Sequence, residues 1–292
     1  MLPNIEHISF QNKTVPKASF EIALLEELFA RGLDKHPELE TLHQVGFYIL
    51  LFVTENTGVH TIDFTEYSYE KRNVISIRKD QIHRFHLTKA KGFLLFFTND
   101  FILSYLEQQE ALKTFQLFNE LLGSPKMSLN TAFYTEILEL VSQIKKEYFN
   151  PIDSYSLGII RSLLHIIITK LYRIKSLETK VPISKKYLSE FITFQKLVEE
   201  HCFNTKKVMD YAQKMGITTK TLNNIVQDIV HKSAKVFIDD IVITKIKRLL
   251  VHAPLSIKEI AYTAGFEDPT NFYKYFKKHT QSSPEAFRKA YL

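Results

Sequence analysis

SIKEIAYTAGFEDPTNFYKYFKKHTQSSPEAFRKAYL, residues 256–292, contains the signals for three successive helices. Ser256 and Glu259 form a capping box that starts the first helix, and Gly265 supplies the left-handed turn that ends it. Asp268 then caps a second helix that has Pro269 at its first position. Apolar spacing predicts that one side of this second helix is buried, and this side carries Phe272, Tyr275, Phe276 and His279.

The opposite side of the second helix is polar and basic. It carries Thr270, Asn271, Lys274, Lys277 and Lys278. A short helix, a glycine turn and a helix with one apolar and one basic face form the arrangement that holds a helix in the major groove of DNA. The stretch therefore predicts a helix-turn-helix, followed by a third helix that begins at Ser283 and Pro284.

This stretch resembles the second helix-turn-helix of the AraC/XylS family of bacterial transcription regulators. The family signature reads roughly IA, three residues, GF, a polar turn, FxxxFKK and then SPxxFR. The matching residues here are Ile260, Ala261, Gly265, Phe266, Phe272, Phe276, Lys277, Lys278, Ser283, Pro284, Phe287 and Arg288. The resemblance implies a homodimer that contacts double-stranded promoter DNA, RNA polymerase and a small-molecule effector. It implies neither a cofactor nor enzymatic activity.

The helix-turn-helix pattern also occurs earlier in the chain. Ala212, Gly216 and Ile217 recur 49 residues later, and Leu222, Val226 and Phe237 recur 50 residues later. We therefore expect a first unit over residues 207–230 and a second over residues 256–279. A joining helix over residues 234–252 is about 28 Å long, which is close to the roughly 34 Å of one DNA turn. The two recognition helices are therefore expected to enter successive major grooves.

The residues expected to contact DNA lie on the outward side of each recognition helix. Asn suits bidentate contact with adenine, and Lys suits contact with guanine or phosphate. On the first helix the outward residues are Lys220, Asn223, Asn224 and Gln227. Alignment with the family implies that base edges are met by Lys220, Asn223, Asn224, Thr270, Asn271 and Lys274, whereas Lys277 and Lys278 meet phosphate. The first unit departs from the family at His231 or Lys232, where many members have Gly, and at Val242, where many have Arg.

Composition and charge agree with a DNA-binding protein of two domains. The chain has 292 residues, 45% of them apolar, and a net charge of +6. From residue 188 onward there are 16 Lys and Arg against 11 Asp and Glu, so most of the net positive charge lies in the last third. The single cysteine, Cys202, excludes an intramolecular disulfide. No signal peptide or membrane-spanning segment is apparent, so a cytoplasmic protein is expected.

Residues 1–100 are predicted to form strands. Short apolar or alternating runs, rich in β-branched and aromatic residues, begin at Gly46, Gly58, Arg72, Gln81 and Gly92. Five such runs at close spacing are typical of a sandwich or barrel. Their order resembles the cupin-like sensor domain of many AraC-family regulators.

A metal-dependent cupin enzyme with a vestigial DNA-binding tail is the alternative from another functional class. Cupin metal sites often use two His one residue apart with a nearby Glu, and His43, His60, His83 and His86 do not have this spacing. His83 and His86 would point to opposite faces of a strand, so no metal site is predicted. Candidates for lining an effector pocket inside the barrel are His43, Tyr48, His83 and Phe85.

Residues 101–175 change to helical periodicity. Helices are expected around 101–122, along a face from Phe133 to Ile144, and along a strongly apolar stripe from Leu157 to Leu171. This region is expected to pack partly on the sensor domain and partly against a second subunit, with a single-subunit core as the alternative. Residues 176–186 lose the periodicity and are expected to form a linker, so that the DNA-binding domain covers 187–292.

Together these observations predict an α+β protein with a cupin-like barrel, dimerisation helices and an all-α domain with two helix-turn-helix units. The expected function is sequence-specific transcription regulation, with an effector-responsive activator as the first interpretation. A constitutive regulator whose β domain only dimerises is a further alternative.

Overall fold

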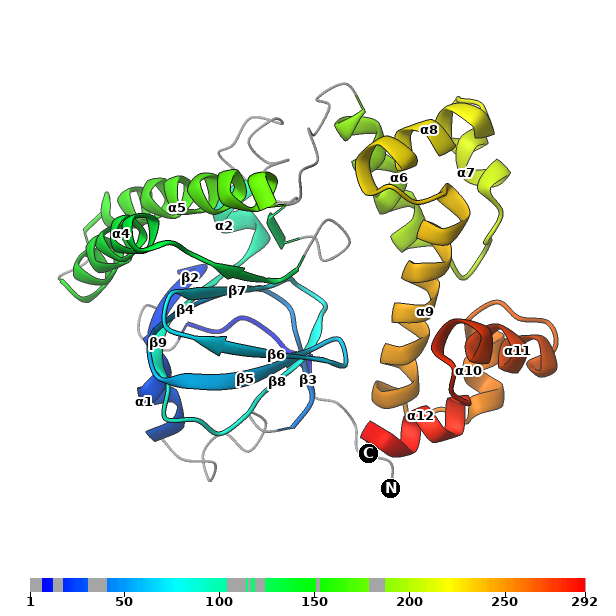
Figure 1. Ribbon diagram of the computed structural model, residues 1–292, viewed down its shortest axis with the longest axis horizontal. Helices are drawn as coiled ribbons and strands as arrows, with labels where there is room; N and C mark the ends of the chain where they lie inside the picture. The colour runs from blue at the N-terminus through cyan, green and yellow to red at the C-terminus, as the bar shows by residue number, and fades with distance from the viewer. Residues whose placement is uncertain are drawn as a thin grey trace. The chain divides into compact units, whose positions relative to one another are not determined.

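The computed structural model describes residues 7–12, 18–30, 41–103, 114, 117–118, 124–150, 153–178 and 187–291. The described residues fall into two compact units, one within residues 6–180 and the other within 181–292 (Figure 1). The first unit contains the β-sheets and the second consists of helices.

The first unit contains two five-stranded sheets. One sheet has the order β1 (His7–Ile8), β3 (His43–Val45), β8 (Ile82–Phe85), β5 (Thr57–Ile62) and β6 (Thr65–Glu70). The other has the order β10 (Lys126–Ser128), β7 (Asn73–Ile77), β4 (Tyr48–Glu55), β9 (Lys91–Phe97) and β2 (Phe20–Leu24). Only β1 and β3 pair in parallel among these strands. We call the first the inner-histidine sheet, because it carries His43, His60 and His83, and the second the helix-covered sheet.

From Ile49 to Val53, strand β4 is buried on both faces, which explains the unbroken apolar sequence of this run. Ile49, Leu51 and Val53 belong to the core between the two sheets. Leu50 and Phe52 point the other way and join the core under the helices. Because successive side chains of a strand alternate between faces, a strand covered on both sides must be apolar at every position.

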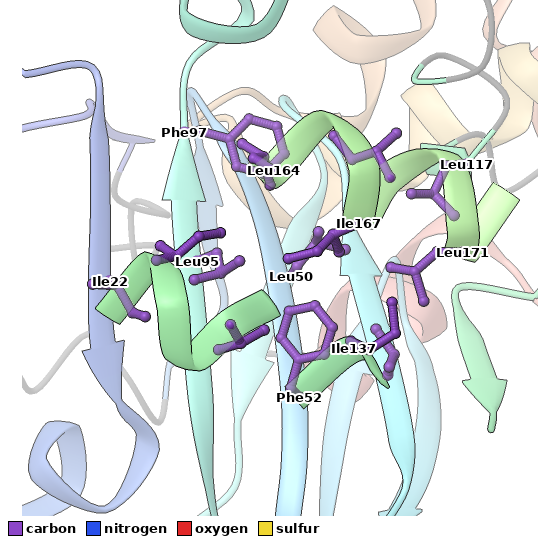
Figure 2. Close-up of a cluster of buried hydrophobic side chains, with 14 of the residues drawn as sticks. Ile22, Leu50, Phe52, Leu95, Phe97, Leu117, Ile137, Leu164, Ile167 and Leu171 are labelled. Atoms are coloured by element: carbon purple, nitrogen blue, oxygen red, sulfur yellow. The ribbon is translucent and has the colours of Figure 1, made fainter. Parts of the chain in front are cut away.

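Helices cover one face of the sheet that contains β4. These are α4 (Thr131–Phe149) and α5 (Ser156–Glu178), and the shorter α1 (Leu25–Ala30) and α2 (Asn99–Leu103) also belong to this unit. Figure 2 shows side chains of α4 and α5 meeting those of β2, β4 and β9. Five residues of the predicted α5 stripe are completely buried in this cluster: Ile160, Leu164, Ile167, Ile168 and Leu171. The greater part of the stripe therefore serves this subunit's own core.

The second unit consists of seven described helices. They are α6 (Leu188–His201), α7 (Val208–Lys214), α8 (Thr219–Val230), α9 (Ala234–His252), α10 (Ile257–Thr263), α11 (Pro269–Thr280) and α12 (Pro284–Tyr291). The long α9 has α6, α7 and α8 towards one end and α10, α11 and α12 towards the other (Figure 1). The predicted capping box is present, because Ser256 and Glu259 each accept a hydrogen bond from the other's backbone N–H.

The α+β fold class predicted from the sequence is confirmed. All five predicted strand runs are observed, as β4, β5, β7, β8 and β9. Much of the predicted helix at 101–122 and most of the predicted linker at 176–186 lie outside the described residues, and residues 176–178 still belong to α5. No helix in the described ranges is long and apolar enough to cross a membrane.

Candidate nucleic-acid interface

The two helix-turn-helix units are built from equivalent residues in equivalent environments. α7 and α8 form the first unit, and α10 and α11 form the second (Figure 1). Four apolar pairs of the sequence repeat have exposed fractions of 8% or less: Ala212 with Ala261, Leu222 with Phe272, Val226 with Phe276, and Phe237 with Phe287. The sequence repeat therefore corresponds to a repeated core, and the same side of α8 and α11 is buried.

Each unit turns at a glycine in the left-handed backbone conformation. The φ angle is 66° at Gly216 and 74° at Gly265. In both units the residue after the glycine donates its N–H to the carbonyl oxygen of the repeated alanine, 3.0 Å away. Gly265 is required for a second reason, because a Cβ at this position would lie 1.9 Å from the backbone oxygen of Phe203. The second turn thus lies against the α6–α7 connection.

The outward sides of α8 and α11 are polar and exposed. Eight of the predicted contact residues lie there: Lys220, Asn224, Gln227, Thr270, Asn271, Lys274, Lys277 and Lys278. Within the described residues, no hydrogen bond or ion pair engages the side chains of these eight. Amide and ammonium groups that have no partner in the protein are available to base edges and phosphates.

Asn223 differs from the other predicted contact residues because its side chain is used inside the protein. Its amide nitrogen donates to the carbonyl oxygen of Thr219 at 2.9 Å, and its amide oxygen accepts from the backbone N–H of Ala234 at 3.0 Å. The side chain is half-buried and joins α8 to the first residue of α9. The Asn223 amide therefore links these two helices and is not available to a base edge.

Both recognition helices end at a non-glycine residue in the left-handed conformation. The φ angle is 55° at His231 and 59° at Gln281, which are equivalent positions of the repeat. Each backbone N–H closes the last turn by bonding to a carbonyl oxygen four residues earlier, that of Gln227 or Lys277. His231 thus performs the turn that Gly performs in many family members, at a conformational cost of about 1 kcal/mol.

Arg288, in the SPxxFR part of the motif, has a structural role that the sequence alone did not indicate. Its Nε donates to the carbonyl oxygen of Leu250 at 2.7 Å, and a terminal nitrogen donates to that of Leu255 at 2.8 Å. These acceptors lie at the end of α9 and in the segment that follows it. Arg288 therefore ties α12 to the start of the second unit, where carbonyl groups at a helix end need partners.

A cluster of histidines lies inside the barrel of the β-sheet unit, residues 6–180, on the inner-histidine sheet. His43, His60 and His83 are at most 2% exposed, and Phe85 is 2% exposed. His60 Nε2 and His83 Nδ1 are 3.0 Å apart, and the rings of His43 and His83 are 4.2 Å apart. Burial lowers the pKa of His60 to about 3, and it also lowers the pKa of His83 well below its usual value. The charges of the neighbouring histidines act in the same direction.

The structure brings three of the four candidate effector residues together and separates the fourth. His43, His83 and Phe85 lie on paired strands, with His43 opposite His83. Tyr48 packs instead against Phe97 and Phe118 in the core under the helices. Its assignment to the pocket is therefore wrong, because its strand alternation directs it away from the barrel interior.

His60, which sequence reasoning weighed only as a metal ligand, belongs to the interior cluster. Its pairing with Phe85 on β8 places it there, a register that the sequence does not reveal. His86 lies on the other side of β8 and bonds to Thr61 through its Nε2, with the two atoms 2.7 Å apart. Among the described residues, no group of three or more His, Cys, Asp or Glu is placed to hold a metal ion.

Comparison with known proteins agrees with the helix-turn-helix geometry of the helical unit, residues 181–292. A family model described as a helix-turn-helix domain matches residues 211–290. An uncharacterized HTH-type transcriptional regulator of Bacillus subtilis, YfiF, is 24% identical over 86% of this chain and 79% of its own. The HTH-type transcriptional activator RhaS of Escherichia coli is 22% identical over 84% of this chain and 86% of its own.

A solved structure, that of ToxT from Vibrio cholerae with a bound unsaturated fatty acid, is 14% identical and covers 93% of this chain and 95% of its own, with a TM-score of 0.45. The two sequence relatives are transcription regulators and not enzymes, and they extend across both units of this chain. Residues 211–290 therefore carry a helix-turn-helix domain, and over both units the chain is similar to HTH-type transcription regulators.

Proposed function

We propose that this protein regulates transcription by inserting α8 and α11 into adjacent major-groove segments of promoter DNA. The observation that carries the proposal is the duplication itself: two recognition helices with equivalent buried sides both expose polar, mostly cationic or amide side chains. The 19 residues of α9 between them correspond to about 28 Å, close to the roughly 34 Å of one DNA turn. The protein would thus read two short sequences on one side of the duplex.

The proposed base contacts are those of Lys220 and Asn224 on α8, and of Thr270, Asn271 and Lys274 on α11. These residues are exposed and lie in the amino-terminal halves of the two helices. Lys277 and Lys278 lie in the last turn of α11, where we assign them to phosphate. Gln227, one turn beyond Asn224 on the exposed side of α8, is assigned to the same groove.

The first test is selection of bound duplexes from a random library by the full-length protein, followed by titration of the best duplex at several salt concentrations. A site with two short sub-sites and a steep loss of affinity with salt is expected, because phosphate neutralisation releases counterions. Binding that stays weak and indifferent to sequence at every salt concentration would contradict the proposal.

Asn271→Ala and Lys274→Ala are each expected to lower discrimination between bases in one sub-site by about 1 to 3 kcal/mol, because each removes a base contact. Titration of the selected duplex and its point variants measures this loss. Lys289→Ala is the matched control, since Lys289 is exposed on α12 and outside both recognition helices. If all three variants discriminate as well as the parent protein, the assignment of the recognition side is wrong.

We further propose that an effector binds inside the barrel at the His60–His83 pair. Whichever tautomers the pair adopts, one of its two outer nitrogens is a donor and the other an acceptor. Within the described structure these atoms, His60 Nδ1 and His83 Nε2, are buried without a hydrogen-bond partner. An unpaired buried polar group costs about 1 to 3 kcal/mol, so a small molecule that offers both a donor and an acceptor would be favoured here.

A thermal-shift screen tests the effector site. A compound that raises the melting temperature of the parent protein, fails to do so with His83→Leu and changes DNA affinity would support it. If no compound alters either property, the regulator is constitutive and the barrel serves assembly alone.

The name of the relative RhaS favours activation, and hence contact with RNA polymerase, as the proposed outcome of DNA binding.

A homodimer is proposed to form along the outer side of α5. Ile159 and Ile166 are 46% and 41% exposed, and their spacing of seven residues places them on one side of the helix, while Tyr155, which is 74% exposed, directly precedes its first residue. Ile166→Glu is expected to convert a dimer into a monomer, because the charge would be buried without a partner. Sedimentation equilibrium measures this. A parent protein that is monomeric at micromolar concentration would contradict the proposal.

A further inference from the structure

Polar contacts attach the second helix-turn-helix unit to the amino-terminal half of α9 and to the α6–α7 connection. The central group is the carboxylate of Asp239, which is on α9 and only 7% exposed. Its Oδ1 accepts a hydrogen bond from the phenol of Tyr275, on α11, at 2.7 Å. The same oxygen accepts from Nζ of Lys235, one turn earlier on α9, at 2.6 Å. The recognition helix of the second unit is thereby fixed to the amino-terminal half of α9.

A second set of contacts starts from the α6–α7 connection. Nζ of Lys206 donates to the carbonyl oxygen of Ala264 at 2.8 Å and lies 4.4 Å from the centre of the Phe266 ring. Ala264 ends α10, and Phe266 follows the turn glycine of the second unit. The Phe266 ring in turn lies 5.3 Å from the ring of Tyr275. The Phe266 ring therefore contacts both Lys206 and Tyr275, so the two sets of contacts meet at this ring.

These contacts are partly shielded from water, because Asp239 is buried and both Lys206 and Tyr275 are half-buried. Burial lowers the pKa of Lys206 and raises that of Tyr275, and the contact with Asp239 raises the latter further, so the phenol keeps its proton and remains a donor. Hydrogen bonds to a buried charged group exceed neutral ones in strength. The apolar contacts that join α11 to α12 are separate from these polar ones, because they are made by the ring of Phe276 with those of Phe272 and Phe287.

We propose that Tyr275, Asp239 and Lys206 are positioning residues that set the distance and rotational phase between α8 and α11, and so make the protein selective for the spacing of its two sub-sites. The inference rests on the proposed function, in which both helices enter DNA. A joint made only of α9 and apolar packing would tolerate small changes of spacing. A joint that is also held by directed bonds on two sides would reject them.

Tyr275→Phe and Lys206→Met are the informative variants, because each removes one donor and keeps the packing of the ring or of the side-chain stem. The probe is the selected duplex together with versions that carry one base pair inserted or deleted between the sub-sites. The parent protein is expected to bind the altered duplexes much more weakly than the selected one. In each variant this spacing penalty is expected to fall about ten-fold, the amount that one charge-assisted hydrogen bond supports.

The chain offers a matched control in Tyr273→Phe. Tyr273 is also on α11 and donates its hydroxyl to Glu285, which is on α12 and thus within the second unit. The same atom is removed from the same helix, but no contact with α9 or with the α6–α7 connection is lost. The spacing penalty is expected to stay at the parent value. An equal fall in Tyr273→Phe and Tyr275→Phe, or an unchanged penalty in Tyr275→Phe, would overturn the proposal.

A measurement without DNA separates this proposal from the proposed function. Spin labels at cysteines introduced at the exposed positions Asp228 on α8 and Lys278 on α11 report the distance between the helices in the full-length protein. Native Cys202 is 1% exposed and is therefore shielded from labelling. One narrow distance is expected for the parent and a broader distribution for Tyr275→Phe. A narrow distribution in both would overturn the positioning role, even if DNA binding is specific.

Discussion

Phe276→Ala is expected to lower the free energy of unfolding of the second helix-turn-helix unit by about 3 to 5 kcal/mol, because it leaves a cavity in a closed aromatic core. The Phe276 side chain is completely buried. Its ring centre lies 6.2 Å from that of Phe272 and 5.7 Å from that of Phe287, so it joins α11 to α12. Loss of this ring removes contacts on both sides at once.

Hydrogen exchange followed by mass spectrometry on the full-length protein measures this effect locally. Amides of α11 and α12 should exchange much faster in Phe276→Ala, whereas those of β4 and β9 should keep their protection. Lys277→Ala is the control next in sequence, and its exposed side chain predicts a change within about 0.5 kcal/mol. Unchanged protection of α11 in Phe276→Ala would show that the ring does not support this core.

Acidification is expected to lower the stability of the β-sheet unit, residues 6–180. The folded pKa of His60 is depressed to about 3, so between that value and the ordinary histidine pKa of about 6.5 the unfolded chain binds more protons than the folded one. Stability is therefore complete above about pH 6.5 and falls as the pH decreases through the window. The loss from pH 7 to pH 5 is about 2 kcal/mol for His60, and His83, whose pKa is also lowered, acts in the same direction.

Urea unfolding of the full-length protein between pH 7 and pH 5, followed by exchange of the β5 and β8 amides, measures this dependence. The double variant His60→Leu and His83→Leu replaces the buried pair with apolar side chains of similar volume that carry no titratable group. In this variant the free energy of unfolding of the β-sheet unit is expected to change less between pH 7 and pH 5, whatever its value at pH 7. An equal slope in the parent and the double variant would mean that other groups cause the acid sensitivity.

The sequence predicted those parts of the fold that depend on local signals. The capping box at Ser256, the turn glycine at Gly265 and the apolar runs of the strands are each determined by neighbours in the chain. Strand β6 was not predicted, because four of its six residues are polar or charged and its apolar content is only Tyr67 and Tyr69. It forms by pairing with β5 along its whole length, a contact that propensity alone does not encode.

Side-chain direction and long-range contacts account for the errors in the candidate sites. Tyr48 was assigned to the barrel interior because the register of β4 cannot be read from a strand that is apolar on both faces. Asn223 has the residue type and position of a base-reading side chain, but the start of α9 uses its amide. The contact of Lys206 with Ala264 spans 58 residues, and that of Tyr275 with Asp239 spans 36, so no local pattern predicts either.

The position of β4 inside its sheet has a consequence for aggregation. The run from Tyr48 to Val53 combines high β-propensity with neither charge nor proline, which is the composition of segments that add to foreign strands. In the folded protein both edges of its backbone are already occupied, by β7 on one side and β9 on the other. Both partners follow β4 in the chain, so during synthesis this segment emerges before either can cover it. Until β7 and β9 have been synthesised and paired with it, the β4 segment is the part of the chain most open to pairing with foreign strands.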